Sequence, residues 1–419
     1  MGNKKFFPVS TENLQVDTIL SFRIYIQTNN KFVLFRKGNH PFSEETLYRL
    51  IANRVTTVYI SEEDMAAFEK YYHEHNDPNK SNISTKTFTP PYDQPDIREK
   101  YFNIYLNYFP AEKNVFIPGI PIDFTVYQKN GLEVEEYFGP KRQGDKPEPI
   151  PDDIHASQNP IVIKNSDISL YRKYLKKLVQ ECSSSRGIST ELHCGIVREN
   201  SKLVIKEVLD DPKNGNNIQK SSSVVETLVD NILGQEKTFY NLMKITSYDY
   251  YTYNHSLNVC TLSIGLGILK NLKRNPDLFE LGLGALLHDV GKSLIDPQII
   301  NKPGKLTDEE YIIVQGHVAA GTKLLEDSSE TIPKNSFFPV LQHHEKISGF
   351  GYPYKLKEKR IHLFGRITAI VDFYDAMVTD RPYRKALEPF DALKLMSEYP
   401  DDYDQVLMKD FVIMLGEQS

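Results

Sequence analysis

Cysteine is scarce in this sequence, and its pattern excludes two kinds of covalent or metal-based stabilisation. The chain has three cysteines, Cys182, Cys194 and Cys260, an odd number with no CxxC spacing. Disulfide-built secreted domains use an even and denser set, so this pattern favours a reducing compartment, and we expect a cytoplasmic protein. His193 lies beside Cys194, but a structural zinc site needs four ligands. The sequence therefore predicts neither a disulfide framework nor a cysteine-based zinc site.

Long apolar runs and an excess of positive charge are also missing. No stretch approaches the roughly 20 consecutive apolar residues of a membrane-spanning helix. No apolar run follows the first five residues, as a signal peptide would require, and Phe6 is a poor match to an N-myristoylation signal. The net charge of −6 and the pI near 6.0 argue against general binding of nucleic-acid polymers or membrane surfaces.

What is present is the composition of a globular protein that is too long for one ordinary domain. Hydrophobic residues make up 40% and charged residues 25% of the 419 positions, as in soluble proteins. Two or three domains are expected at this length. We expect an α+β module over 1–75, a linker over 76–100, a diverged second copy of the module over 101–215, a connector helix over 216–250, and an all-α helical-bundle catalytic domain over 251–419.

The expectation of two modules depends on a weak internal repeat with an offset of 102 to 103 residues. Phe7-Pro8 matches Phe109-Pro110, and Phe22–Tyr25 matches Phe124–Tyr127. A later block joins Ile60, Asp64, Phe68, Lys70 and Tyr71 to Ile163, Asp167, Tyr171, Lys173 and Tyr174. A near-constant offset over separate blocks indicates a duplication.

Each copy reads as a small mixture of strands and helices. Alternating apolar residues predict strands near 23–26, 31–36 and 55–60 of the first copy. Serine caps followed by acidic residues predict helices over 43–53 and 61–72. In the second copy a proline-rich polar run over 139–160 replaces the first helix. This half of the chain has no catalytic constellation, and we expect it to be regulatory or to bind signalling partners.

The connector carries apolar residues at helical spacing, which indicates a helix over 218–250 that packs on a partner. These residues are Val225, Leu228, Val229, Ile232, Phe239, Leu242 and Met243. Packing on the catalytic domain of the same chain is the simpler interpretation. A homodimer seam that carries a signal is the sharper one, although Gly234 and Gln235 interrupt the pattern.

The strongest chemical signal is a concentration of histidines, because five of the eleven lie between residues 255 and 344. One histidine in an apolar helical segment is usually a core residue, but five of them with two aspartates would each need a buried partner. The group comprises His255, His288, Asp289, His317, His343, His344 and Asp372. Imidazoles and carboxylates that converge on one point form a transition-metal site, so the sequence predicts metal binding.

His288 and Asp289 are adjacent, so they point in different directions from a helix and could contact two metal ions, with the aspartate between them. Lys292 follows Asp289 by three residues. On a continued helical turn it shares their face and can meet a phosphate oxygen.

These residues resemble the HD phosphohydrolase superfamily. His288-Asp289 is similar to its signature, and His343-His344-Glu345 followed by Gly349-Phe350-Gly351-Tyr352-Pro353 resembles the extended motif of the HD-GYP branch. Similarity also covers Lys302–Leu306, Asp372–Met377 and Arg381–Arg384, so that it spans roughly residues 235–415. The resemblance implies a helical domain with two or three metal ions that hydrolyses cyclic di-GMP, a bacterial second messenger.

The resemblance also implies roles for single residues. Metal ligands are expected at His255, His288, Asp289, His317, His343, His344 and Asp372, with Asp289 bridging. Lys292, Arg381 and Arg384 match the contacts to substrate phosphate, and Gly351-Tyr352-Pro353 matches the loop beside the site. Some members hold a third ion with a glutamate four residues before the first histidine. Tyr251 occupies that position here, so we expect two ions.

The chemistry of phosphodiester hydrolysis agrees with this expectation. Two ions about 3.5–4 Å apart supply a bridging hydroxide at neutral pH and clamp the phosphoryl oxygens. An imidazole-rich ligand set favours iron or manganese over magnesium, and zinc and nickel are also compatible with these ligand types. We therefore expect a metal-dependent phosphodiesterase that converts cyclic di-GMP to pGpG, GMP or both, with Asp289 and Lys292 in catalytic roles.

One departure from the family pattern keeps two alternatives open. Ser348 stands where the family usually has aspartate before the Gly-x-Gly-Tyr-Pro element, so the loop or the turnover could differ. The first alternative is a non-catalytic effector that binds cyclic di-GMP or a protein through the same pocket. The second is a related phosphohydrolase for other nucleotides or cyclic dinucleotides.

Overall fold

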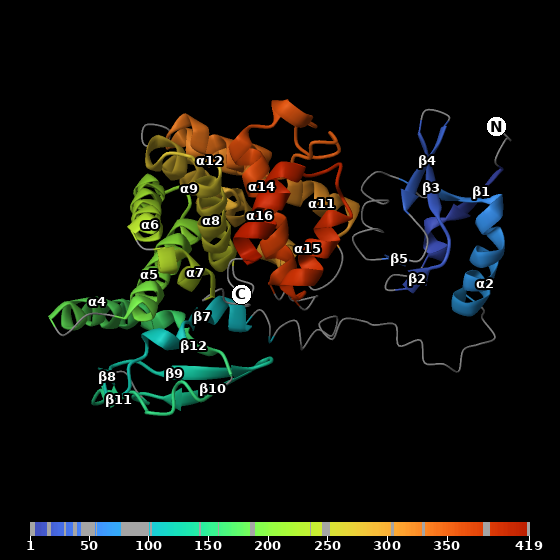
Figure 1. The fold of residues 1–419 in the computed structure, drawn as a ribbon. Helices are drawn as coiled ribbons and strands as arrows, with labels where there is room; N and C mark the ends of the chain where they lie inside the picture. Colours follow the sequence, from blue (N-terminus) through green and yellow to red (C-terminus); the bar gives the residue numbers. More distant parts are fainter. Residues whose placement is uncertain are drawn as a thin grey trace. The chain divides into compact units, whose positions relative to one another are not determined.

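The computed structural model describes the larger part of the chain (Figure 1). The described residues are 5–14, 18–28, 31–36, 40–42, 55, 57–76, 100, 103–141, 144–157, 159–184, 189–234, 236–244, 252–302, 306–328, 332–379 and 386–416. They fall into two compact units, Met1–Thr89 and Pro90–Ser419. Each unit has its own hydrophobic core.

The first unit contains a four-stranded antiparallel sheet in the order β1-β6-β3-β4. Its strands are β1 (Phe6–Ser10), β3 (Ile24–Thr28), β4 (Lys31–Arg36) and β6 (Thr57–Ser61), and a small pair joins β2 (Thr18–Leu20) to β5 (His40–Phe42). The turn η2 (Glu62–Asp64) leads into helix α2 (Met65–Asn76). Alternate strand residues such as Val58 and Ile60 point to one face, where they are buried with Phe22 and Phe68.

The second unit begins with a sheet of the same kind, in the order β10-β9-β12-β7. Its strands are β7 (Tyr108–Ala111), β9 (Val126–Asn130), β10 (Glu133–Phe138) and β12 (Ile161–Lys164), with a small pair of β8 (Pro121–Ile122) and β11 (Glu148–Pro149). The turn η6 (Asn165–Asp167) leads into helix α4 (Ile168–Ser184).

The two sheets correspond strand by strand, which confirms the predicted pair of duplicated α+β modules. Strands β1, β3, β4 and β6 take the places of β7, β9, β10 and β12, and each sheet is followed by a short turn and a helix. The helix predicted over 43–53 lies outside the described residues. In the second copy the described part of 139–160 forms no helix, as the proline-rich run indicated.

The rest of the second unit is helical, which confirms the predicted helical bundle (Figure 1). Its helices are α5 (Thr190–Asp210), α6 (Gly215–Gly234), α7 (Glu236–Lys244), α8 (Thr252–Leu269), α9 (Phe279–Leu287), α10 (Pro297–Ile300), α11 (Asp308–Gln315), α12 (His317–Asp327), α13 (Phe337–Gln342), α14 (Leu363–Val378), α15 (Pro389–Ser397) and α16 (Gln405–Gly416). Helix α8 is buried at every position from Tyr253 to Gly267. A helix that is covered on all sides forms the centre of a bundle, and α5, α9, α14 and α16 pack around this one.

The connector differs from the single helix predicted over 218–250. Helix α6 ends at Gly234, and α7 begins at Glu236. Gln235, the residue between them, lies outside the described residues. The apolar residues of both helices are buried in the hydrophobic core of the second unit, which agrees with packing on the same chain. A homodimer seam stays a prediction.

The hydrophobic core is continuous from the second sheet into the helical bundle. Phe109 of β7 stacks on Tyr253 of α8 with ring centres 5.5 Å apart, and both rings are buried. Within the described ranges, no helix combines the length and the apolar composition needed to cross a bilayer.

Candidate metal centre

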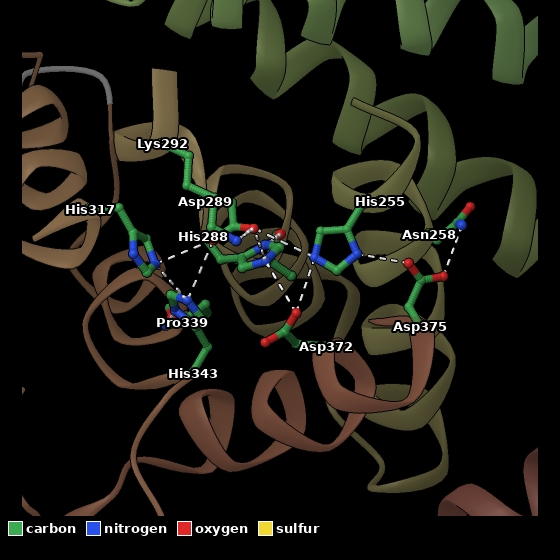
Figure 2. A network of polar contacts seen from close by, with 11 residues as sticks. His255, Asn258, His288, Asp289, Lys292, His317, Pro339, His343, Asp372 and Asp375 are labelled. Carbon is green, nitrogen blue, oxygen red and sulfur yellow. Dashed lines mark hydrogen bonds and ion pairs between the residues drawn. The ribbon is translucent and has the colours of Figure 1, made fainter. Parts of the chain in front are cut away.

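The structure brings together all seven residues that the sequence predicts as metal ligands, and Figure 2 labels all of them except His344. They are His255 in α8, His288 and Asp289 after α9, His317 at the start of α12, His343 and His344 after α13, and Asp372 in α14. Most of them lie at helix ends, where the backbone turns and side chains from different helices can converge. His344 and Asp372 are only partly buried, so the cluster is open on their side.

Asp289 lies at the centre, and its two carboxylate oxygens face two different sets of imidazoles. Oδ2 lies 3.3 Å from Nε2 of His288 and 3.6 Å from Nε2 of His255. Oδ1 lies 3.3 Å from Nε2 of His317 and 3.7 Å from Nε2 of His343. A carboxylate with one oxygen toward each set has the geometry of a bridge between two cations.

Asp372 closes one side of the cluster. Its Oδ1 lies 3.0 Å from Nε2 of His255 and 3.7 Å from Nε2 of His288. Both imidazoles therefore have a carboxylate oxygen on two sides, one from Asp289 and one from Asp372. This half of the centre carries more negative charge than the half around His317.

Backbone carbonyls fix the protonation pattern of three rings. Nδ1 of His288 donates to the carbonyl of Ala285, Nδ1 of His317 to Val314, and Nδ1 of His343 to Pro339, at 2.6 to 2.8 Å. A carbonyl can only accept, so each Nδ1 carries its hydrogen. In the neutral ring Nε2 is then a lone pair directed at the centre, as in histidines that bind metal.

The donor atoms fit a cation better than they fit one another. Nε2 of His288 and Oδ1 of Asp289 are buried and have no hydrogen-bond partner. Nε2 of His317 and Nε2 of His343 are 3.2 Å apart, although both are lone pairs in the neutral rings. Buried polar atoms normally have a partner, and a transition metal accepts both nitrogen and carboxylate oxygen. The cluster can therefore hold metal.

The electrostatics of the cluster divide the histidines into two kinds. Burial alone would lower the pKa of His288, but the carboxylates of Asp289 and Asp372 raise it to about 10. Burial lowers the pKa of His317 to about 4 and that of His343 to about 3. The Asp289 and Asp372 side therefore attracts positive charge strongly, whereas the opposite side presents neutral rings.

Lys292 pairs with the central carboxylate. Its Nζ lies 2.5 Å from Oδ2 of Asp289, and the turn η8 (Val290–Leu294) places it three residues further along, as the spacing indicated. Burial would raise the pKa of Asp289, but Lys292 and the surrounding histidines lower it well below its usual range. Asp289 is therefore ionised, so that both of its oxygens are available as ligands.

Two residues without a role in the sequence analysis support His255. Nδ1 of His255 donates to Oδ2 of Asp375 at 2.7 Å, and Nδ2 of Asn258 donates to Oδ1 of the same carboxylate at 2.9 Å (Figure 2). Asp375 thereby sets the tautomer of His255 and turns its Nε2 to the centre. Asp375 follows Asp372 by three residues on α14, and Asn258 follows His255 by three on α8. That helical spacing was the available signal.

The Gly-Tyr-Pro element forms the loop beside the open side of the cluster. The ring of Tyr352 stacks on His344 with centres 4.5 Å apart. A Cβ on Gly351 would lie 2.4 Å from the backbone nitrogen of Lys346, so only glycine allows the loop to fold this closely. Glu345 anchors the loop by accepting from the backbone nitrogens of Tyr354 and Leu356 at 2.7 and 2.9 Å.

A carboxylate lies beside this loop even though Ser348 stands where an aspartate is usual in the family. Its hydroxyl donates to Oδ1 of Asp402 at 2.7 Å, and Nζ of Lys346 donates to Oδ2 of the same residue at 3.0 Å. The backbone nitrogen of Ile347 donates to the carbonyl of Asp402. The carboxylate of Asp402, from the C-terminal part of the chain, therefore lies beside Lys346 and Ser348 of the loop.

Some residues of the expected site lie outside the described part of the structure. They are Arg381 and Arg384, the two expected phosphate contacts, as well as Tyr251 and Pro303–Lys305. Their roles stay predictions from the resemblance.

Comparisons with known proteins agree with this geometry. Residues 252–407 match the HD domain family. The chain is 34% identical over 226 residues to a cyclic di-GMP phosphodiesterase of Pseudomonas aeruginosa, an alignment that covers 54% of this chain and 54% of the relative. It is also 43% identical over 98 residues to a 3'3'-cGAMP-specific phosphodiesterase of Vibrio cholerae, covering 23% of this chain and 19% of that protein. The chain thus spans about half the length of the first of these relatives.

The fold has a counterpart among solved structures. A protein of Bdellovibrio bacteriovorus described as an HDG"Y"P protein superposes with a TM-score of 0.56 at 20% identity, covering 74% of this chain and 99% of that one. At this identity the likeness concerns the fold alone. The family match, the identity to a curated relative and the shared fold converge with the His-Asp cluster and the Gly-Tyr-Pro loop. Residues 252–407 of this chain therefore form an HD domain, which is similar to the domains of cyclic di-GMP phosphodiesterases and of an HDG"Y"P protein.

Proposed function

We propose that the protein is a metal-dependent phosphodiesterase that hydrolyses cyclic di-GMP to pGpG, GMP or both, regulated by its N-terminal half. The observation that carries this proposal is the position of Asp289. One oxygen of its carboxylate faces His255 and His288, and the other faces His317 and His343. Such a bridge is the basis of a two-metal site for phosphoryl chemistry.

The ligands divide into two positions that share Asp289. The first position takes Oδ2 of Asp289 with His255, His288 and Asp372, and the second takes Oδ1 with His317, His343 and His344. Imidazole-rich sets of this kind suit iron or manganese better than magnesium. Two such ions, when bound, supply a hydroxide nucleophile at neutral pH and neutralise the charge of the phosphodiester.

The side chains around the cluster would bind and orient the substrate. Lys292 lies beside the shared carboxylate, where its ammonium group can exchange Asp289 for a phosphate oxygen. Arg381 and Arg384 would hold the flanking phosphate as bidentate donors. Tyr352, stacked on His344, offers a ring beside the open side of the cluster, where a guanine base could stack.

The relatives support a cyclic dinucleotide as substrate. The Pseudomonas relative is named a cyclic di-GMP phosphodiesterase and matches over 54% of this chain, whereas three Vibrio cholerae relatives named as 3'3'-cGAMP-specific match over 23% to 35%. Cyclic di-GMP is therefore the first substrate to test, and 3'3'-cGAMP is the second.

The decisive experiment measures turnover and metal content on the same sample, with protein purified without oxygen so that ferrous ions are kept. We expect hydrolysis of cyclic di-GMP with about two metal ions per chain. Asp289→Ala should lose both the metal and the activity, because it removes a ligand from both positions. Asp296→Ala is the matched control. It removes only the N-cap of α10, where the carboxylate accepts from the nitrogen of Gln298.

Three outcomes would contradict the proposal in different ways. Hydrolysis by Asp289→Ala at the wild-type rate would show that the shared carboxylate is not needed. A metal-loaded protein that binds cyclic di-GMP without cutting it would be an effector. Turnover of 3'3'-cGAMP alone would change the substrate and keep the chemistry.

A further inference from the structure

A network of buried polar side chains, called the polar network below, connects the candidate metal centre to the second N-terminal module. It begins at His255, whose Nδ1 donates to Asp375, and continues to Asn258, which donates to the same carboxylate. Nη2 of Arg198, on α5, donates to Oδ1 of Asn258 at 2.7 Å. Arg198 is 1% exposed and Asn258 is 2% exposed, so water does not compete for these contacts.

Arg198 reaches the second module on its other side. Its Nε lies 3.6 Å from Oε1 of Glu112, which immediately follows strand β7. Nζ of Lys202, one turn further along α5, lies 3.5 Å from the same oxygen and donates to the carbonyl of Pro110 at 2.9 Å. Both cations of α5 are thus attached to the end of β7.

The positive charges of Arg198 and Lys202 are matched by two carboxylates, Glu112 and Glu199. Lys202 forms a closer ion pair with Glu199 of α5, and Oε2 of Glu199 accepts from the hydroxyl of Tyr171 on α4 at 2.6 Å. Glu199 and Lys202 are both fully buried. Two cations and two carboxylates in a dry interface hold each other in one geometry, because a charge that lost its partner there would be costly.

We propose that the second module is a structural support of the metal centre, and that Arg198 is the positioning residue through which it acts. Arg198 holds Asn258, Asn258 and His255 share the carboxylate of Asp375, and Asp375 sets the direction of Nε2 of His255. Glu112 contributes an ion pair to Arg198 at 3.6 Å, which is longer than a hydrogen bond. This inference depends on the proposed metal ligands.

The polar network reaches only one of the two proposed metal positions. It ends on His255, which belongs to the first metal position. Among the described residues, the network from Arg198 to Asp375 forms no hydrogen bond or ion pair with His317, His343 or His344. Changes at Arg198 should therefore weaken one of the two metal positions and leave the other unchanged. A general loss of stability would not separate the two positions in this way.

The test is a titration of the metal-free full-length protein with Mn²⁺, in competition with a fluorescent chelator. Changes in the groups that orient a ligand typically cost 10- to 100-fold in metal affinity, and Arg198 acts through two intermediate side chains. We expect two Mn²⁺ ions in the wild type, and in Arg198→Met about a 10-fold weaker affinity at one position only. Arg198→Lys keeps the charge without the planar fork, so its affinity should lie between the two.

Glu112→Gln provides a milder variant in case Arg198→Met does not fold. Its side chain is 17% exposed, so the change removes a charge near the edge of the cluster and should weaken the same position about 3-fold. Glu207→Gln is the matched control. It removes a carboxylate of α5 that pairs with Arg172 and Lys220 and takes no part in the polar network. The Mn²⁺ affinities of both metal positions should therefore be unchanged.

The outcomes separate this inference from the proposed function. A wild type that binds no Mn²⁺ would overturn both. Two tight sites in the wild type with unchanged affinities in Arg198→Met and Glu112→Gln would overturn the inference and leave the proposed metal ligands standing. Equal weakening of both positions would also overturn it, because the effect would then be general.

Discussion

Asp289 and its neighbours carry most of the chemistry at the scale of single residues. The carboxylate faces imidazoles with both oxygens and pairs with Lys292, so its surroundings determine both its ionisation and its direction. The seven expected ligands could be found from the sequence because imidazoles and carboxylates in apolar segments are costly without a shared partner. Asp375 and Asn258 could not be assigned in the same way, because their roles depend on a contact between α8 and α14.

Lys292→Gln should separate substrate binding from metal binding. The variant removes an ammonium group from the phosphate site, so kcat/KM for cyclic di-GMP should fall about 10- to 100-fold, as for the loss of a charged hydrogen bond. Metal content should be unchanged, because removal of a cation next to Asp289 does not weaken its attraction for metal. Lys270→Gln, which loses only an ion pair with Asp410, is the control. Loss of metal with an unchanged kcat/KM in the remaining loaded protein would contradict the assignment.

Gly291→Ala should disturb the position of His317. A Cβ at this site would lie 2.0 Å from the carbonyl oxygen of His317 and 2.5 Å from the nitrogen of Gly321, so η8 and α12 would have to separate. Overpacking of this kind costs about 1–3 kcal/mol. We expect a lower free energy of unfolding together with weaker metal binding, measured by denaturant titration and by metal content. Gly234→Ala at the end of α6 meets no atom within 4 Å and should be neutral or slightly stabilising.

Local patterns predicted several elements at the scale of helices and strands. Thr307 and Glu310 form the reciprocal cap of α11, and a threonine followed three residues later by glutamate is the sequence pattern typical of such a cap. The strand predicted over 31–36 is β4. The small pairs β2-β5 and β8-β11 were not predicted, because strands of two or three residues have no periodicity to detect.

The loop from Glu345 to Tyr354 offers a test of how Ser348 is accommodated. In Ser348→Asp a second carboxylate would face Asp402, and like charges at this distance cost about 1 kcal/mol or more. We expect lower stability and lower turnover for Ser348→Asp, and recovery in the double variant Ser348→Asp/Asp402→Asn, because one charge is again opposite one neutral group. Thermal unfolding and kcat measure the two effects. Additive losses in the double variant would show that the two positions do not interact.

The duplication was the main feature of the whole molecule that the sequence predicted, because a constant offset survives divergence of the residues between the matched blocks. The buried ion pairs between α5 and the second module were not predicted. Arg198, Glu199 and Lys202 look like an ordinary charged stretch, and only the folded chain shows that they lie inside it.

Removal of metal should affect the two compact units differently. All seven expected ligands belong to the second unit, Pro90–Ser419. A ligand present at 100 times its Kd stabilises the folded state by about 2.7 kcal/mol per site, so Mn²⁺ should raise the unfolding temperature of this unit and a chelator should lower it. The transition of the first unit should not move. Differential scanning calorimetry of the full-length chain checks this, and a metal-dependent shift in both transitions would contradict it.

The second copy of the module shares an interface with the helical domain of its own unit. The second copy places Glu112 against Lys202 of α5 and Phe109 against Tyr253 of α8, the helix that carries His255. A substitution in its sheet should therefore also disturb the helical domain. The first copy has a core of its own within Met1–Thr89. Residues such as Phe109 and Glu112 therefore have two structural roles, one in the second copy of the module and one against the helices beside the candidate metal centre.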